Sequence, residues 1–246
     1  MDLDALGGLL AAAFAAAVML LLERNRSEAW TEREVETSSW RPLPFLRAAA
    51  AAAAGVAAGI LTADTGASRW AVSASAAAVT SLILLVVDTD IVSKRIPFEP
   101  CYAATAAGLG LGFAGGTTAG AIATGLAVLF VGLVWLIGKV TSGLGMGDTR
   151  LLLSIAAGSA WWVGFQPIMG MLLVACLVQL FARAVLAGHR LASGKGVKLG
   201  FLPFAPALAA GALLSLGLAA STNFGPCQDW PSGITAQCSS AQLGAS

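Results

Sequence analysis

Apolar residues are grouped along the chain into long blocks, which short charged segments separate. A helix of about 20 apolar residues crosses the roughly 30 Å hydrocarbon core of a bilayer. The blocks therefore predict eight transmembrane spans, at residues 6–22, 48–63, 70–87, 100–114, 119–138, 149–164, 167–187 and 203–220. The second, fourth and sixth of these are short and rich in alanine and glycine. The pattern predicts an all-α fold, a polytopic transmembrane helical bundle.

Composition points to the same class of protein. The chain is 57% hydrophobic and only 11% charged, with a mean hydropathy of +0.81, whereas a soluble domain carries roughly 25% charged residues. Lys plus Arg number 14 and Asp plus Glu number 13, so the net charge of +1 is too small to attract nucleic acid. The first block follows the acidic residues Asp2 and Asp4. A signal peptide begins with basic residues instead, so we expect a retained helix.

The distribution of basic residues predicts the orientation in the membrane. Lys and Arg near the ends of spans are retained on the cytoplasmic side. Of the fourteen Lys and Arg residues, all but Arg69 fall in alternate segments between the predicted spans or near the span ends next to those segments. We therefore expect a multi-pass protein of the cytoplasmic (inner) membrane, in contact with its lipid, with both termini outside. The expected division is a membrane domain at 1–222, with an inner loop at 23–47, and a polar external tail at 223–246.

The cysteines give no sign of a metal site. Cys227 and Cys238 lie in the polar tail, where an external location would allow them to form a disulfide. The chain contains no C-x-x-C pair, the spacing typical of structural zinc sites. We expect neither a metal nor another cofactor.

Three carboxylates at the ends of predicted spans are the candidates for chemistry. Asp88 and Asp90 follow the third span, and Asp148 opens the sixth within a glycine-rich segment. A carboxylate at membrane depth is costly unless it is paired or hydrated. Two spans separate Asp90 from Asp148, which puts both on the cytoplasmic face. If their helices pack together, the two carboxylates can share one proton, and Gly145 and Gly147 would allow a close approach. One carboxylate as base and one as acid is the chemistry of aspartic proteolysis.

Three segments resemble the motifs of a known family. The segment Asp90-Ile-Val-Ser-Lys-Arg-Ile96-Pro97 resembles D-x5-[IL]-P, and Gly145-Met-Gly-Asp148 resembles G-x-G-D. Leu202-Pro-Phe-Ala-Pro206 is similar to a PFGP-like stretch that opens a late span. Together, over residues 82–210, they resemble the type IV prepilin peptidases, a family of intramembrane aspartic proteases.

The resemblance implies that Asp90 and Asp148 are the catalytic pair. It also implies that the substrates are prepilin-like proteins, whose basic leader peptides are removed at the cytoplasmic face.

The chain departs from the family pattern at three of these positions. Phe98 follows the motif proline where the family usually has Asn or Asp, and Arg150 stands where it usually has Lys. Ala205 replaces the Gly between the two prolines. Bifunctional members carry a Cys-rich cytoplasmic insert associated with N-methylation. The predicted inner loop contains no Cys, so methyltransferase activity is not implied.

Two more acidic residues flank the predicted pair. Asp88 competes with Asp90 for the first catalytic role, but residues two apart on a helix point about 200° apart. The register with Ile96 and Pro97 favours Asp90. We expect Asp88 and Glu99 to attract the basic leader peptide instead.

Two other functions remain alternatives. Presenilin-like and signal-peptide-peptidase-like proteases also combine G-x-G-D with a later P-A-L, and Pro206-Ala-Leu208 is present. Thr89 stands before Asp90 where those proteases have Tyr, which argues against this reading. Paired carboxylates could also serve a proton-coupled transporter. Such a transporter is expected to have broken mid-membrane helices and repeat symmetry, and neither is visible in the sequence.

Overall fold

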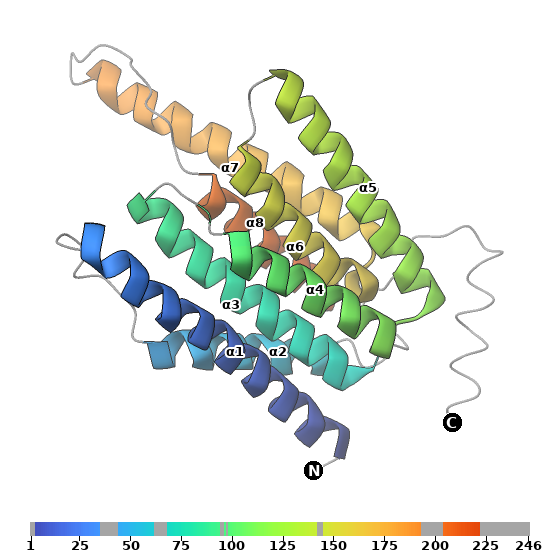
Figure 1. Ribbon diagram of the computed structural model, residues 1–246. Coiled ribbons are helices and arrows are strands. Elements are labelled where there is room, and N and C mark those ends of the chain that lie inside the picture. The colour runs from blue at the N-terminus through green and yellow to red at the C-terminus, as the bar shows by residue number, and fades with distance from the viewer. Residues whose placement is uncertain are drawn as a thin grey trace.

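The computed structural model describes residues 3–34, 44–61, 68–93, 96, 98–141, 145–192 and 204–221. These residues form helices and no strand (Figure 1), which confirms the all-α expectation. The helices are α1 (Leu3–Glu34), α2 (Pro44–Leu61), α3 (Arg69–Ser93), α4 (Phe98–Gly115), α5 (Thr118–Thr141), α6 (Met146–Val163), α7 (Phe165–Ala192) and α8 (Ala205–Ser221).

Each predicted span corresponds to one of these helices, but the expected inner loop is partly helical. Of the predicted loop at 23–47, residues 23–34 extend α1 and residues 44–47 begin α2. The segment 23–34 contains no Gly or Pro, and its Glu, Arg and Ala residues favour helix. Pro44 suits the first position of α2 because its fixed φ fits a helix and its missing N–H is not needed there.

Three helices within the described residues are long and apolar enough to cross a membrane. Their apolar stretches are Arg69–Val87 of α3, Thr118–Val140 of α5 and Phe165–His189 of α7. Shorter apolar helical stretches lie at Leu6–Leu21, Leu46–Leu61 and Ala205–Leu218.

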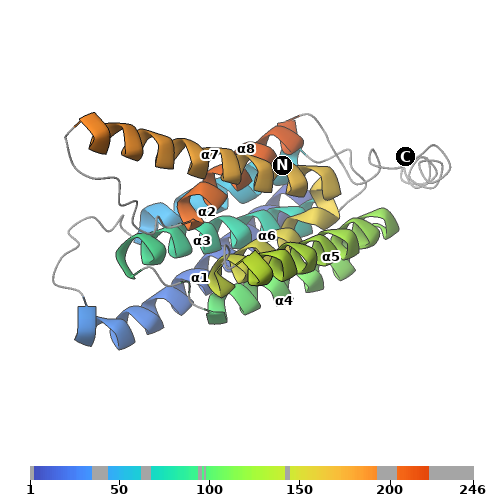
Figure 2. The ribbon, with the colours of Figure 1, turned by 90° about the horizontal axis from the view of Figure 1, so that it is seen from above.

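Successive helices run in alternating directions through the bundle (Figures 1 and 2). The ends of α1, α3, α5 and α7 therefore gather with the beginnings of α2, α4, α6 and α8. This end of the bundle is called the carboxylate end below, because it contains Asp90 of α3 and Asp148 of α6.

Helices α3 and α6 form the centre of the bundle. α3 packs against α1, α2, α4, α6 and α8, whereas α5 packs mainly on α6 and α7 mainly on α8. α6 is buried at 14 of its 18 residues. The element that carries Asp148 is therefore surrounded by protein along most of its length.

Small residues bring the central helices close together. A Cβ atom added to Gly108 of α4 would lie 2.6 Å from the Cα of Gly158 in α6, so the two backbones are nearly in contact. Ser75 Oγ of α3 donates a buried hydrogen bond to the carbonyl oxygen of Gly158. Interfaces of small residues, with hydroxyl hydrogen bonds between helices, are typical of packing within a bilayer.

Gly164 ends α6 and begins the turn into α7. Its φ of 91° lies in a region that residues with a Cβ rarely adopt. Its N–H donates to the carbonyl oxygen of Ala160 at 2.9 Å. This turn fixes the far end of α6, opposite Asp148.

Candidate active site

The Asp90 carboxylate lies near the end of α3 and is held by the beginning of α8. It is 4% exposed, and its Oδ2 accepts a hydrogen bond of 3.1 Å from the backbone N–H of Ala205. The N–H of Leu208 donates to the carbonyl oxygen of Phe204 at 3.0 Å, so Phe204 caps α8 and Ala205 is its first helical residue. The first N–H groups of a helix have no partner within it, and Asp90 accepts one of them.

The Asp148 carboxylate lies in the first turn of α6 and is 8% exposed. Gly145 is the N-cap residue, with an extended backbone, and the carboxylate of Asp148 accepts a hydrogen bond from its backbone N–H. Thr149 strengthens the same turn, because its N–H and its Oγ1 both donate to the carbonyl oxygen of Gly145 at 3.2 Å. A side chain at the third helical position that bonds back to the cap residue is one half of a capping box.

The two carboxylates interact electrostatically. Both lie outside the three apolar stretches that could cross a membrane. Burial, and to a lesser extent the negative charge of Asp90, together raise the pKa of Asp148 to about 6 against the opposing effect of the Gly145 N–H. Burial also raises the pKa of Asp90, and the Ala205 N–H opposes that shift. Two close carboxylates in a desolvated site bind a proton at a higher pH than an isolated Asp does.

A direct contact joins the two motif segments. A Cβ atom added to Gly147 would lie 2.9 Å from the Cβ of Ile96, so the missing side chain lets Ile96 pack on the first turn of α6. A Cβ on Gly145 would lie 3.1 Å from Oδ2 of Asp148. The two glycines predicted to allow close approach therefore both lie where space is short.

The predicted residue Arg150 contacts aromatic rings of α4. Its guanidinium carbon lies 5.8 Å from the ring centroid of Phe98 and 5.7 Å from that of Tyr102. The two rings meet edge to face, with centroids 6.3 Å apart. Two of the three departures from the family pattern, Phe98 and Arg150, thus contact each other. This arrangement is a cation–π contact at the carboxylate end.

The remaining predicted residues are less informative. Glu99 is exposed in the first turn of α4. Asp88 belongs to α3, but its side chain lies outside the described residues, as do Pro97, Cys227 and Cys238. The preference for Asp90 over Asp88 as a catalytic residue therefore stays a prediction, as does the disulfide between Cys227 and Cys238. Among the described residues, no cluster of three His, Cys, Asp or Glu side chains could hold a metal ion.

Sequence reasoning missed two groups at the carboxylate end. One is the Ala205 N–H, which holds Asp90; the motif similarity at residues 202–206 was its only signal. The other is Arg47, which the sequence assigned to a loop but which is 6% exposed in the first turn of α2. Its burial could not be foreseen, because an Arg beside a predicted span is usually solvated.

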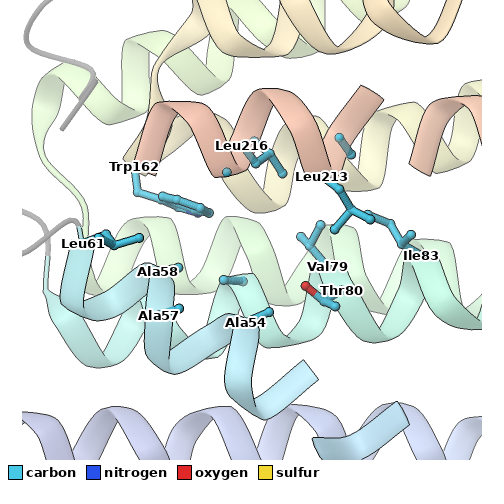
Figure 3. A pocket seen from close by; sticks show the side chains of 13 residues that line it. Ala54, Ala57, Ala58, Leu61, Val79, Thr80, Ile83, Trp162, Leu213 and Leu216 are labelled. Atoms are coloured by element: carbon cyan, nitrogen blue, oxygen red, sulfur yellow. The ribbon is translucent and has the colours of Figure 1, made fainter. Parts of the chain in front are cut away.

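A separate hollow of about 200 Å³ lies between α2, α3, α6 and α8 (Figure 3). Its described lining is almost entirely aliphatic, from Ala54 of α2 to Leu216 of α8. Thr80 adds a hydroxyl, and Trp162 directs its Nε1 to the carbonyl oxygen of Gly158 at 3.0 Å. None of the lining residues carries an acid or a base, so this hollow offers no group for proton transfer.

In comparisons with known proteins, no family model, no curated protein and no solved structure matches the chain.

Proposed function

We propose that the chain is a multi-pass membrane aspartic endopeptidase, which removes leader peptides from prepilin-like substrates at the cytoplasmic face. The proposal rests on the motif resemblance and on one structural observation. Asp90 and Asp148 are both buried at the same end of the bundle, and the charge of one raises the pKa of the other. Buried carboxylates with perturbed pKa values are candidates for acid–base catalysis.

The chemistry requires one ionised and one protonated carboxyl group. The ionised group takes a proton from water as the water oxygen bonds to the scissile carbonyl carbon, and the protonated group gives its proton to the carbonyl oxygen. The resulting diol then collapses. The C–N bond breaks, the first carboxyl gives its proton to the amine nitrogen, and a diol hydroxyl returns a proton to the second carboxyl.

The proposed topology has all eight helices as spans and both termini outside. Of the fourteen basic residues, all but Arg69 then fall on the carboxylate side of the membrane, which the positive-inside rule makes cytoplasmic. Asp90 and Asp148 would thus meet a leader peptide on the side where it is made. We propose that Asp88 and the exposed Glu99 attract the basic residues of that leader.

The continuity of the helices favours a protease over a proton-coupled transporter. α3 and α6 run without a break, and their aspartates lie near helix ends. Transporters bind their ions near the bilayer midplane, at broken helices.

A cleavage assay tests the proposal. The full-length protein, purified in detergent, is incubated with a synthetic peptide that carries a basic leader and a following apolar segment. We expect one cut at the boundary between the two, and loss of cleavage in Asp90→Asn and in Asp148→Asn. Asp64→Asn, in a segment predicted to be external, is the matched control and should cleave normally. A cut inside the apolar segment would favour the presenilin-like alternative, and the absence of cleavage would contradict the proposal.

The topology has its own test. In a background with all four cysteines replaced, Ala192→Cys at the end of α7 and Thr118→Cys at the start of α5 are both exposed. A membrane-impermeant maleimide should label position 118 from outside and position 192 only after the membrane is opened. Labelling of both positions from one side would require an even number of spans between them, instead of the proposed three, and would contradict the proposed arrangement.

A further inference from the structure

A second hollow, of about 320 Å³, lies between α4, α5 and α6, and it is called the α4–α5 hollow below. The helices α4 and α5 are joined by the short turn at residues 116–117 and separate from each other away from it (Figure 1). Each of them packs on α6 far more than on the other. Pockets that receive small molecules measure about 300–1,000 Å³, so this hollow is large enough for part of a ligand.

The walls of the α4–α5 hollow are apolar or small. Its described lining contains no charged residue and one hydroxyl, that of Thr124, which donates to the carbonyl oxygen of Gly120 at 2.9 Å. Leu109, Phe113 and Val128 of the lining have exposed side chains, so the hollow opens to the surroundings of the bundle. Because α5 carries one of the three stretches that are apolar enough to cross a membrane, these surroundings are lipid in a bilayer.

The Trp161 indole lines this hollow and has an unpaired N–H. The side chain is 1% exposed, and its Nε1 is buried without an acceptor among the described residues. Trp162, the next residue, is equally buried but donates from its Nε1 to the carbonyl oxygen of Gly158 at 3.0 Å. A buried Trp N–H usually has a partner, because an unpaired donor costs about 1–3 kcal/mol.

The indole is placed between a tight wall and an open one. A Cβ atom added to Gly112, which also lines the hollow, would lie 3.2 Å from Cγ and 3.3 Å from Cδ1 of Trp161. Both atoms belong to the five-membered ring that carries Nε1, so this ring lies against the α4 wall. A Cβ added to Gly125 in the α5 wall would meet nothing within 4 Å, so space remains on that side.

The chemistry of the hollow favours one occupant over two others. A buried water needs about two to four polar partners, and the described lining offers only Trp161 Nε1 and the Thr124 hydroxyl. A second helix would fill the apolar space, but its backbone carbonyls are already bonded within the helix. A phospholipid supplies both an apolar chain and a free ester carbonyl. Trp161 lies near the end of α6 at Val163, where indole rings meet the headgroup region.

We infer that the α4–α5 hollow binds a membrane phospholipid, whose acyl chain lies between α4 and α5 and whose ester carbonyl oxygen accepts a hydrogen bond from Trp161 Nε1. The lipid then satisfies the buried donor and fills the space that the two helices leave open. The inference rests on the membrane location proposed above and is independent of proteolysis.

The test measures the affinity of two lipids for the full-length protein in mild detergent. Dioleoylphosphatidylglycerol is titrated into the protein, and native mass spectrometry reports the fraction with a lipid bound. The dialkyl ether analogue, which has the same headgroup and similar chains but no ester carbonyl, is titrated in parallel. We expect the unaltered protein to bind the diester lipid about 2- to 10-fold more tightly, the ratio expected from one hydrogen bond.

Two matched pairs of variants locate the site. Trp161→Phe removes the N–H but keeps an aromatic ring, so the preference for the diester should disappear. Trp162→Phe loses an N–H that is bonded within α6 and should keep the preference. Gly125→Leu places a side chain in the hollow and should weaken the binding of both lipids by about 10-fold or more. Gly132→Leu lies on the same helix, outside the hollow, where a Cβ meets nothing within 4 Å, and should bind normally.

Three results would overturn the inference. Equal affinity of the unaltered protein for the two lipids would do so without any variant, and normal lipid binding by folded Gly125→Leu would do so as well. A dimer that Gly125→Leu dissociates would assign the hollow to a second copy of the chain. If the diester is preferred as expected but the leader peptide is not cleaved, the proposed function fails while the lipid site stands.

Discussion

The inner helices α3 and α6 differ from the outer helices α5 and α7 in burial, and α6 differs from them in polarity as well. Within the apolar stretch of α3, 72% of residues are buried, against 28% in α5 and 17% in α7. α6 is more polar, and it is not among the three helices that are long and apolar enough to cross a membrane. Yet 14 of its 18 residues are buried. Both outer helices thus carry the apolar signal of a span, but only one of the two inner helices does.

The outer and inner faces of such a bundle have different surroundings. In a bilayer, apolar side chains such as Leu129 and Leu180, which are exposed, meet lipid without cost. Small and polar residues pack against one another inside. The buried hydroxyls of Ser154 and Ser159 in α6 both bond to backbone carbonyl oxygens. Asp148 lies on the same helix, so one of the two candidate carboxylates belongs to a helix that apolar length alone would not identify.

The largest difference in stability between the inner and the outer helices should follow from adding one methyl group to each. Gly158→Ala in α6 would bring a Cβ to 2.5 Å from Val79 Cγ2, and overpacking of this kind costs about 1–3 kcal/mol. Gly132→Ala in α5 meets nothing within 4 Å and should gain up to about 1 kcal/mol from helix propensity. Thermal unfolding in detergent should show a lower midpoint for the first variant and an equal or higher one for the second. Equal midpoints would remove the distinction between inner and outer helices.

A methyl group at Gly147 should affect activity. The added Cβ would lie 2.9 Å from Ile96 Cβ, and this atom cannot move away as the tip of a flexible side chain could. The first turn of α6 must shift, and a misplacement of catalytic groups by up to 1 Å can cost about 100-fold in rate. We expect turnover of the leader peptide to fall by about 10- to 100-fold. Gly188→Ala in α7, where nothing lies within 4 Å, should keep the normal rate; similar rates for the two variants would refute the close contact.

Replacement of Arg150 by Lys should have a smaller effect, on stability. Lys keeps the charge but loses the planar guanidinium that lies near the rings of Phe98 and Tyr102. An exposed cation–π contact contributes about 0.5–1 kcal/mol. A double-mutant cycle with Phe98→Leu isolates this contact in thermal unfolding. Additive losses in the cycle would mean that Arg150 and Phe98 do not stabilise each other.

The smallest expected effect concerns Glu99. Because this carboxylate is exposed, its attraction for a basic leader is screened and weak. Glu99→Gln should raise KM by roughly two- to five-fold at low salt and leave kcat unchanged, as expected for lost ground-state binding. The difference from the unaltered protein should vanish in high salt. A KM that is unchanged at low salt would exclude Glu99 from substrate binding.

The sequence predicted the helices and the carboxylate pair for clear physical reasons. Blocks of apolar residues must form helices to satisfy their backbone groups in lipid, so the eight helices follow the eight blocks. An even number of intervening helices brings Asp90 and Asp148 to one end, and the glycines before Asp148 mark a close approach. These features depend on local composition and on counting, which a sequence displays directly.

Other features depend on which helices become neighbours, and no local pattern specifies that. The hydrogen bond from Ala205 to Asp90 is made by a backbone N–H, which every residue except proline possesses. The contact between Arg150 and Phe98 joins α6 to α4. The extension of α1 to Glu34 was missed because charged residues after an apolar block suggest a loop, although they are also good helix formers.

The most direct measurement of the central claim is a double-mutant cycle on Asp90 and Asp148. If the two carboxylates act as one acid–base pair, Asp90→Asn and Asp148→Asn should each lower kcat/KM for the leader peptide by about 10²- to 10⁴-fold. The double variant should then be no slower than either single variant, because residues that act as a unit are not additive. Losses that multiply in the double variant, or normal cleavage by either single variant, would contradict a shared catalytic pair.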